Sequence, residues 1–104
     1  MKGLTVKEDS GVLSAYISCE LDHHVAKSIR EAIDAELIIK KPATLRIDFS
    51  AVDFMDSSGI GLIIGRADKA AALGGTVEIC GLSPRLRRLV RMSGVEKLKN
   101  LKIT

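Results

Sequence analysis

The apolar residues follow two different periods along the chain, and the period changes at regular intervals. Short β-rich runs at 4–6 and 12–17 are separated by a turn-forming Lys-Glu-Asp-Ser-Gly stretch, which predicts an opening hairpin. From about Asp22 to Ile39 the apolar positions recur at helical spacing, and Lys40-Lys41-Pro42 ends this predicted helix. Its apolar face is expected to consist of Val25, Ile29, Ala32, Ile33 and Leu37.

The second half of the chain repeats this alternation. Residues 44–49 predict a buried strand, and after a short loop a helical pattern runs to about Leu73, where Gly74-Gly75 stops it. Residues 76–80 predict a third short strand. The predicted apolar face of the second helix is Ile60, Ile63, Ile64, Ala67 and Ala71.

A third helix is expected to begin at Ser83-Pro84, with a capping residue before proline, and to end near Gly94. Residues 98–103 suit a final strand. Strands that alternate with helices at these lengths indicate a single α/β domain over residues 1–104, with parallel strands joined by helical crossovers.

Composition narrows the possible partners. The chain is 46% hydrophobic, so a real core is available, but only three residues are aromatic and none is tryptophan. Few aromatics disfavour a base-stacking surface for single-stranded nucleic acid. The net charge is +3, from 16 basic and 13 acidic residues, and this mild excess permits an acidic partner without requiring nucleic acid.

The cysteines and the hydropathy indicate a cytoplasmic chain. Cys19 and Cys80 lie far apart in the sequence, without a secretory signal, and are expected to be reduced and partly buried thiols. No apolar run approaches the roughly 20 residues of a membrane span. The amino terminus becomes polar too early for a signal peptide.

The motifs of the sequence give little support for an enzyme. Gly59, Gly61 and Gly65 form G-x-G-x-x-x-G, which matches neither a dinucleotide fingerprint nor a phosphate-binding loop. The G-x-S-x-G nucleophile motif is absent, and the adjacent His23 and His24 lack the spacing of a metal site. We therefore expect no catalytic residues, no metal and no cofactor.

The predicted third helix carries a line of arginines opposite its apolar face. Arg85, Arg88 and Arg91 recur at i, i+3 and i+6, whereas Leu86 and Val90 lie on the other side. A solvated outer face is the ordinary interpretation of such a line, and binding of an acidic partner is the alternative.

The sequence Asp56-Ser57-Ser58-Gly59 at the start of the second predicted helix has more capping groups than a helix needs. One side chain suffices to cap the helix and contributes about 1 kcal/mol. A spare hydroxyl at an exposed helix start is open to phosphorylation, and the helix dipole tolerates the added charge. Capping alone does not decide between Ser57 and Ser58.

Several segments together resemble the STAS-domain anti-sigma factor antagonists. These are Cys19–His24, Phe54–Arg66, Cys80–Pro84 and Arg88–Gly94, and they span nearly the whole chain in the family's order. The resemblance implies a mixed sheet of four to five strands covered by helices, with the C-terminal helix short or absent because the sequence stops at Thr104. One departure is Cys19, where the family usually has glycine, and it is expected to alter that turn.

The resemblance also implies a function in partner switching. The unphosphorylated chain would bind an anti-sigma factor serine kinase and release a sigma factor, whether for sporulation or for stress. Phosphorylation of Ser57 would prevent binding, and a serine phosphatase would reset the chain. No direct contact with nucleic acid or membrane is implied. The expected contact residues are Glu20, Asp22, Asp56, Ser58, Gly59, Ile60 and Gly61.

A role from another class stays open beside this one. STAS modules also serve as accessory subunits of lipid or anion transport systems. Copurification with a permease or an ATPase would favour that alternative.

Overall fold

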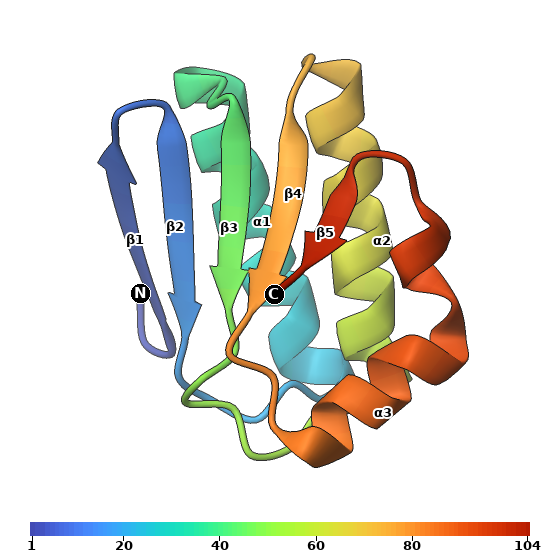
Figure 1. The fold of residues 1–104 in the computed structure, drawn as a ribbon. Coiled ribbons are helices and arrows are strands. Elements are labelled where there is room, and N and C mark those ends of the chain that lie inside the picture. The colour runs from blue at the N-terminus through green and yellow to red at the C-terminus, as the bar shows by residue number, and fades with distance from the viewer.

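The computed structural model describes all of residues 1–104 and contains the predicted succession of elements (Figure 1). The final strand is shorter than the predicted 98–103, because residues 98–100 form a bend and a turn before it. The elements are β1 (Leu4–Asp9), β2 (Val12–Ile17), α1 (His23–Lys40), β3 (Thr44–Asp48), α2 (Ser57–Ala72), β4 (Thr76–Cys80), α3 (Pro84–Ser93), η1 (Val95–Lys97) and β5 (Leu101–Ile103).

The five strands form one mixed sheet in the order β1-β2-β3-β4-β5. The opening hairpin β1–β2 is antiparallel, and every later pair is parallel, as helical crossovers require. Helices α1 and α2 lie behind the sheet in Figure 1, and α3 lies at its lower right edge. This architecture confirms the predicted fold class.

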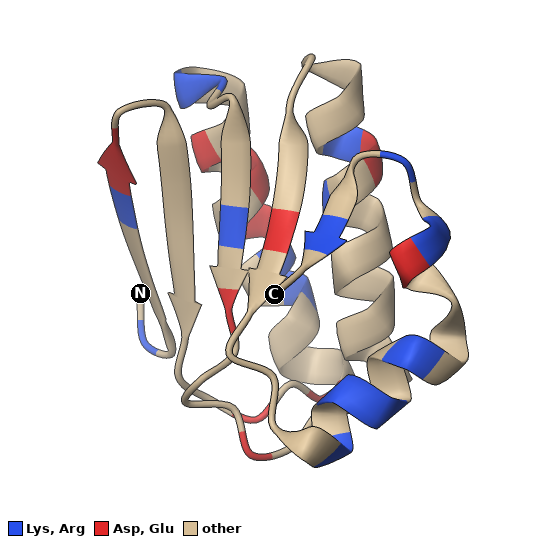
Figure 2. Ribbon diagram, in the orientation of Figure 1, with Lys and Arg blue, Asp and Glu red and all other residues tan.

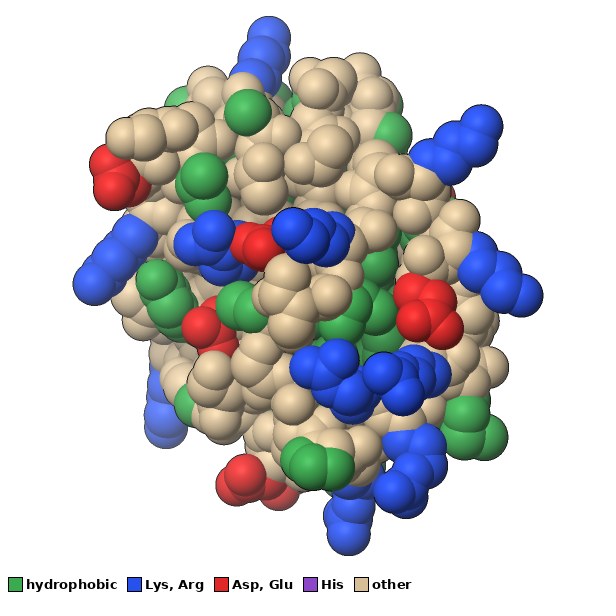
Figure 3. All heavy atoms as spheres, viewed as in Figure 1, with side chains coloured by type: hydrophobic (Ala, Val, Ile, Leu, Met, Phe, Trp, Pro, Cys, Tyr) green, Lys and Arg blue, Asp and Glu red, His purple; other side chains and the backbone are tan.

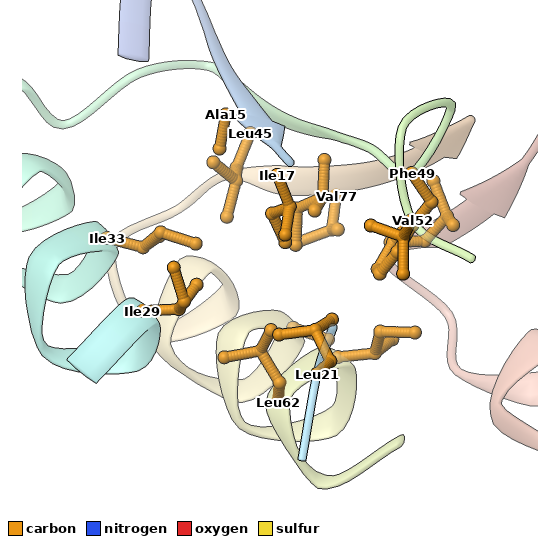
Figure 4. Packing of buried hydrophobic residues seen from close by; sticks show 14 of the residues in the cluster. Ala15, Ile17, Leu21, Ile29, Ile33, Leu45, Phe49, Val52, Leu62 and Val77 are labelled. Atoms are coloured by element: carbon orange, nitrogen blue, oxygen red, sulfur yellow. The ribbon is translucent and has the colours of Figure 1, made fainter. Parts of the chain in front are cut away.

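The core lies between the sheet and the two helices behind it (Figure 4). Alternate residues of each strand face the helices, for example Leu13, Ala15 and Ile17 of β2, and all three are buried. Ile29 and Ile33 of α1 meet them at helical spacing. Each fully buried aliphatic side chain of this kind contributes about 1.5–3 kcal/mol.

The apolar face predicted for α2 is partly wrong. Ile63 and Ala67 are buried as expected, but Ile64 is 38% exposed and Ala71 is also exposed. Successive helical residues are about 100° apart, so a stripe that holds Ile63 and Ala67 turns Ile64 outward. The buried residues of α2 are Gly59, Leu62, Ile63, Arg66, Ala67 and Ala70.

No helix covers the other face of the sheet. Arg46, Glu78 and Lys102 are register neighbours on β3, β4 and β5, and Figure 3 shows a basic, acidic and basic row of side chains across this face. Arg46 and Glu78 form an ion pair. None of the helices combines the length and the apolar character needed to cross a membrane.

Candidate functional site

The carboxyl ends of the parallel strands bring the predicted contact loops to one edge of the sheet, the lower edge in Figure 1. There the loop after β2 pairs with the loop after β3 through a single parallel bridge between Leu21 and Met55. The Leu21 amide donates to the Phe54 carbonyl at 3.0 Å, and the Asp56 amide donates to the Leu21 carbonyl at 3.3 Å. The bridge therefore fixes the Glu20–Asp22 loop beside the start of α2.

Asp56 caps α2. Its Oδ1 accepts a hydrogen bond from the Ser58 amide at 2.8 Å, and Ser57 is the first helical residue. Asp22 does the same for α1, accepting from the Val25 amide at 2.9 Å. The Asp56 carboxylate carries out the capping of α2, and the hydroxyls of Ser57 and Ser58 make no hydrogen bond within the chain.

The two serines differ in their surroundings. Ser57 is exposed, whereas Ser58 is half-buried and lines a groove between α1 and α2. A modifying enzyme reaches an exposed hydroxyl at the first turn more readily than one in a groove. Solvent exposure therefore distinguishes Ser57 from Ser58, which helix capping alone does not.

The glycines that follow differ as well. Gly59 is buried, and a Cβ atom built on it would lie 2.0 Å from Cγ of Met55, itself buried. Gly61 is exposed and has no heavy atom within 4 Å of such a Cβ. Gly59 therefore allows Met55 to pack under the helix start and offers no free surface of its own, while Gly61 and the half-buried Ile60 lie within reach of a partner.

Negative charge collects on the two bridged loops. Glu20, Asp22, Asp53 and Asp56 lie within residues 18–22 and 49–56, which contain no lysine or arginine. Figure 2 shows these acidic positions along the lower edge, with the basic helix α3 beside them. Arg85, Arg88 and Arg91 are exposed on α3, opposite the buried Leu86 and Val90, as the sequence predicts.

Two exposed apolar side chains, one on this edge and one on α2, are absent from the contact residues expected from sequence. Phe54 is 45% exposed in the loop before Ser57, and Ile64 lies two turns into α2 on its outer face. The sequence did indicate that Phe54 is exposed, because it lies in a predicted loop between Asp53 and Asp56. The helical period placed Ile64 in the core, so nothing in the sequence indicated its exposure.

Cys19 occupies its turn without backbone strain. The only non-glycine residues with positive φ are Ser10 and Lys41, so the turn at position 19 does not need glycine. The Cys19 thiol is half-buried and donates to the Gly3 carbonyl at a sulfur–oxygen distance of 3.7 Å. Burial, and then the charge of Asp22, raise the pKa of this thiol, which therefore stays protonated near neutral pH.

Neither cysteine forms a disulfide, in agreement with the sequence prediction. His23 and His24 are both exposed at the start of α1. No three His, Cys, Asp or Glu side chains gather in a geometry able to hold a metal ion.

The chain belongs to the STAS domain family, whose model matches residues 4–104. It is 33% identical over 95 residues to the anti-sigma F factor antagonist of Paenibacillus polymyxa, covering 91% of this chain and 81% of that protein. It is also 29% identical over 100 residues to the anti-sigma-B factor antagonist of Listeria monocytogenes, covering 95% and 87%. Both relatives are named for regulation rather than for enzymatic activity.

Solved structures give the same result. The anti-sigma factor antagonist SpoIIAA in its unphosphorylated form superposes with a TM-score of 0.82 at 26% identity, over 97% of this chain and 87% of that one. The Bacillus cell fate determinant SpoIIAA in the phosphorylated form gives a TM-score of 0.74 at 26% identity, over 97% and 90%. Both the unphosphorylated and the phosphorylated form of SpoIIAA therefore have the fold of this chain.

Proposed function

We propose that the chain is an anti-sigma factor antagonist controlled by phosphorylation of Ser57. In this proposal the unphosphorylated form binds an anti-sigma factor serine kinase in the cytosol and thereby releases the sigma factor. The relatives named for this activity support the proposal. The observation that carries it is the exposed Ser57, with an unengaged hydroxyl, beside the bridged Glu20–Asp22 loop.

Ser57 acts as a substrate in this scheme. Its Oγ attacks the γ-phosphorus of ATP held by the kinase, the bond to the bridging oxygen breaks, and ADP leaves, while the hydroxyl proton passes to a base of the kinase. A phosphatase later hydrolyses the Ser57 phosphate ester and restores the hydroxyl. The chain itself holds no cofactor in this scheme.

The fold is expected to tolerate the phosphate. Ser57 gives up no internal hydrogen bond, since its hydroxyl makes none, and Asp56 continues to cap the helix. The amino terminus of α2 carries a partial positive charge that partly offsets the added negative charge. Modification should therefore act on partner binding rather than on folding.

Binding is expected to fail for two physical reasons. Phosphate adds nearly two negative charges to an edge that already carries Glu20, Asp22 and Asp56. A kinase that covers the exposed Phe54 would also have to remove water from a dianion three residues away along the chain, which costs several kcal/mol unless cations compensate it.

The proposal is tested by mixing the chain with the anti-sigma factor kinase of its own organism and ATP, and by mapping phosphate with mass spectrometry. Wild type and Ser58→Ala should be phosphorylated at Ser57, and Ser57→Ala should take up no phosphate. Phosphate on Ser58 in the wild-type chain, or unchanged phosphate uptake by Ser57→Ala, would overturn the assignment.

A further inference from the structure

A basic groove lies on the α1 side of the candidate site. It has a volume of about 530 Å³ and runs between the amino-terminal turns of α1 and α2, which lie side by side in Figure 1. Lys27 and Arg30 line it from α1, and Ser58 and Gly61 line it from α2. No acidic side chain lines the groove.

The cations of this groove have no partner within the chain. The three ion pairs are Lys40–Glu36, Arg46–Glu78 and Arg66–Asp34, so Lys27 and Arg30 are both unpaired. Both residues are exposed. Their positive charge is therefore available to a ligand that enters from solvent.

A buried ion pair joins the two helices one turn beyond the groove. Arg66 follows Leu62 by four residues on α2, and Asp34 follows Arg30 by four residues on α1, so each lies one turn further along. Their ion pair, with Nε 2.8 Å from Oδ1, is largely buried. The Asp34 carboxylate therefore pairs with Arg66 and not with a cation of the groove. Burial lowers the pKa of Arg66, and the nearby positive charge of Arg30 lowers it further.

The charge of this groove comes from two cations one helical turn apart. Lys27 and Arg30 line it from α1 and are separated by about 4.5 Å along the helix axis, given a rise of 1.5 Å per residue. An acidic segment with two carboxylates can pair with both cations, and Arg30 can bind one of the carboxylates through two parallel hydrogen bonds. The wall therefore suits an acidic peptide.

We propose that this groove receives an acidic segment of the anti-sigma factor kinase. The inference rests on the proposed function and adds a second contact to it. The partner would present basic groups to the Glu20–Asp22 loop and acidic groups to the Lys27–Arg30 wall, on either side of Ser57. Such opposed patches fix one orientation of the complex, because a reversed partner would meet like charges on both sides.

Carbodiimide cross-linking of the wild-type complex tests the contact directly, because this reagent joins an amine to a neighbouring carboxylate without a spacer. Lys27 should form a cross-link to an aspartate or glutamate of the kinase, located by mass spectrometry. Lys97 and Lys99, exposed at the opposite end of the sheet, should form none. A complex in which Lys27 stays unlinked would overturn the inference.

Charge reversal provides the quantitative test. The double variant Lys27→Glu/Arg30→Glu should bind the kinase roughly tenfold or more weakly than wild type, with a smaller dependence on salt. The matched control Lys97→Glu/Lys99→Glu changes net charge equally and should bind like wild type. Circular dichroism of each variant checks that it is folded, and the cross-linking needs no variant.

The outcomes separate this inference from the proposed function. If wild type binds and is phosphorylated at Ser57 while Lys27→Glu/Arg30→Glu binds equally well, the groove is not a docking site and the switch remains. The groove is likewise ruled out as a docking site if inorganic phosphate occupies it without changing kinase affinity. If wild type does not bind the kinase at all, both proposals fail.

Discussion

At the scale of single residues, Met55 and Gly59 are a matched pair. The Met55 side chain fills the space where a Cβ of residue 59 would stand, and this packing holds the loop under the first turn of α2. Asp56, between them, caps that turn. The positions of Ser57 and Ser58 therefore depend on two neighbours that themselves take no part in any chemistry.

Gly59→Ala tests this packing, with Gly61→Ala as its control. Moving the buried Met55 costs about 1–3 kcal/mol, and alanine in a helix returns up to about 1 kcal/mol relative to glycine. We expect Gly59→Ala to lower the free energy of unfolding by roughly 1–2 kcal/mol in urea denaturation. Gly61→Ala has open space and should be neutral or stabilising. Equal stability of the two variants would contradict this role of Met55 and Gly59.

At the scale of elements, the Arg66–Asp34 pair joins α2 to α1. The Arg66 side chain is only 6% exposed and that of Asp34 is 22% exposed. Nε and Nη1 of Arg66 are buried without a hydrogen-bond partner, so Asp34 compensates the charge without an aligned hydrogen bond. Removing the carboxylate would leave a guanidinium buried and uncompensated.

Asp34→Ala should therefore lower the free energy of unfolding by roughly 2–3 kcal/mol, less than for a fully buried pair because Asp34 retains some solvent. Glu36→Ala on the same helix removes an exposed i,i+4 pair with Lys40 and should cost no more than about 0.5 kcal/mol. Thermal or urea unfolding of both variants measures the difference. A cost for Asp34→Ala as small as that for Glu36→Ala would show that Arg66 reaches solvent.

The elements themselves were predictable because each has a clear hydrophobic period and a recognisable end. Ser83-Pro84 starts α3, and the helix before Pro42 ends at Lys40, with Lys41 in the left-handed region. Orientation within an element was harder to predict. Ile64 and Ala71 fit the apolar period and are exposed, while the charged Arg66 is buried, because a helix face is fixed by its neighbours as much as by its own sequence.

At the scale of the whole molecule, the site exists because parallel strands end at one edge. Glu20 and Asp22 belong to the loop after β2 and Asp56 to the loop after β3, and the pairing of Leu21 with Met55 brings these two loops together. The difference between Ser57 and Ser58 and the basic groove beside them also depend on how α1 packs against α2. Those features could not be derived from local sequence alone.

Phosphorylation of Ser57 should affect stability and affinity very differently. Stability depends on the core and on the caps, which the phosphate does not touch, so circular dichroism and the melting temperature should be nearly unchanged. In the proposed function, affinity for the kinase depends on the edge that bears Ser57, Phe54 and the acidic loops. A charge buried there without compensation costs about 3–5 kcal/mol, which corresponds to roughly a hundredfold or more in affinity.

The most direct test is isothermal titration calorimetry of the cognate anti-sigma factor kinase with the chain, unmodified and phosphorylated at Ser57. The unmodified chain should bind, and the phosphorylated chain should bind roughly a hundredfold or more weakly while melting at nearly the same temperature. Equal affinity of the two forms, or a lost affinity explained by unfolding of the phosphorylated chain, would contradict the claim that Ser57 controls binding.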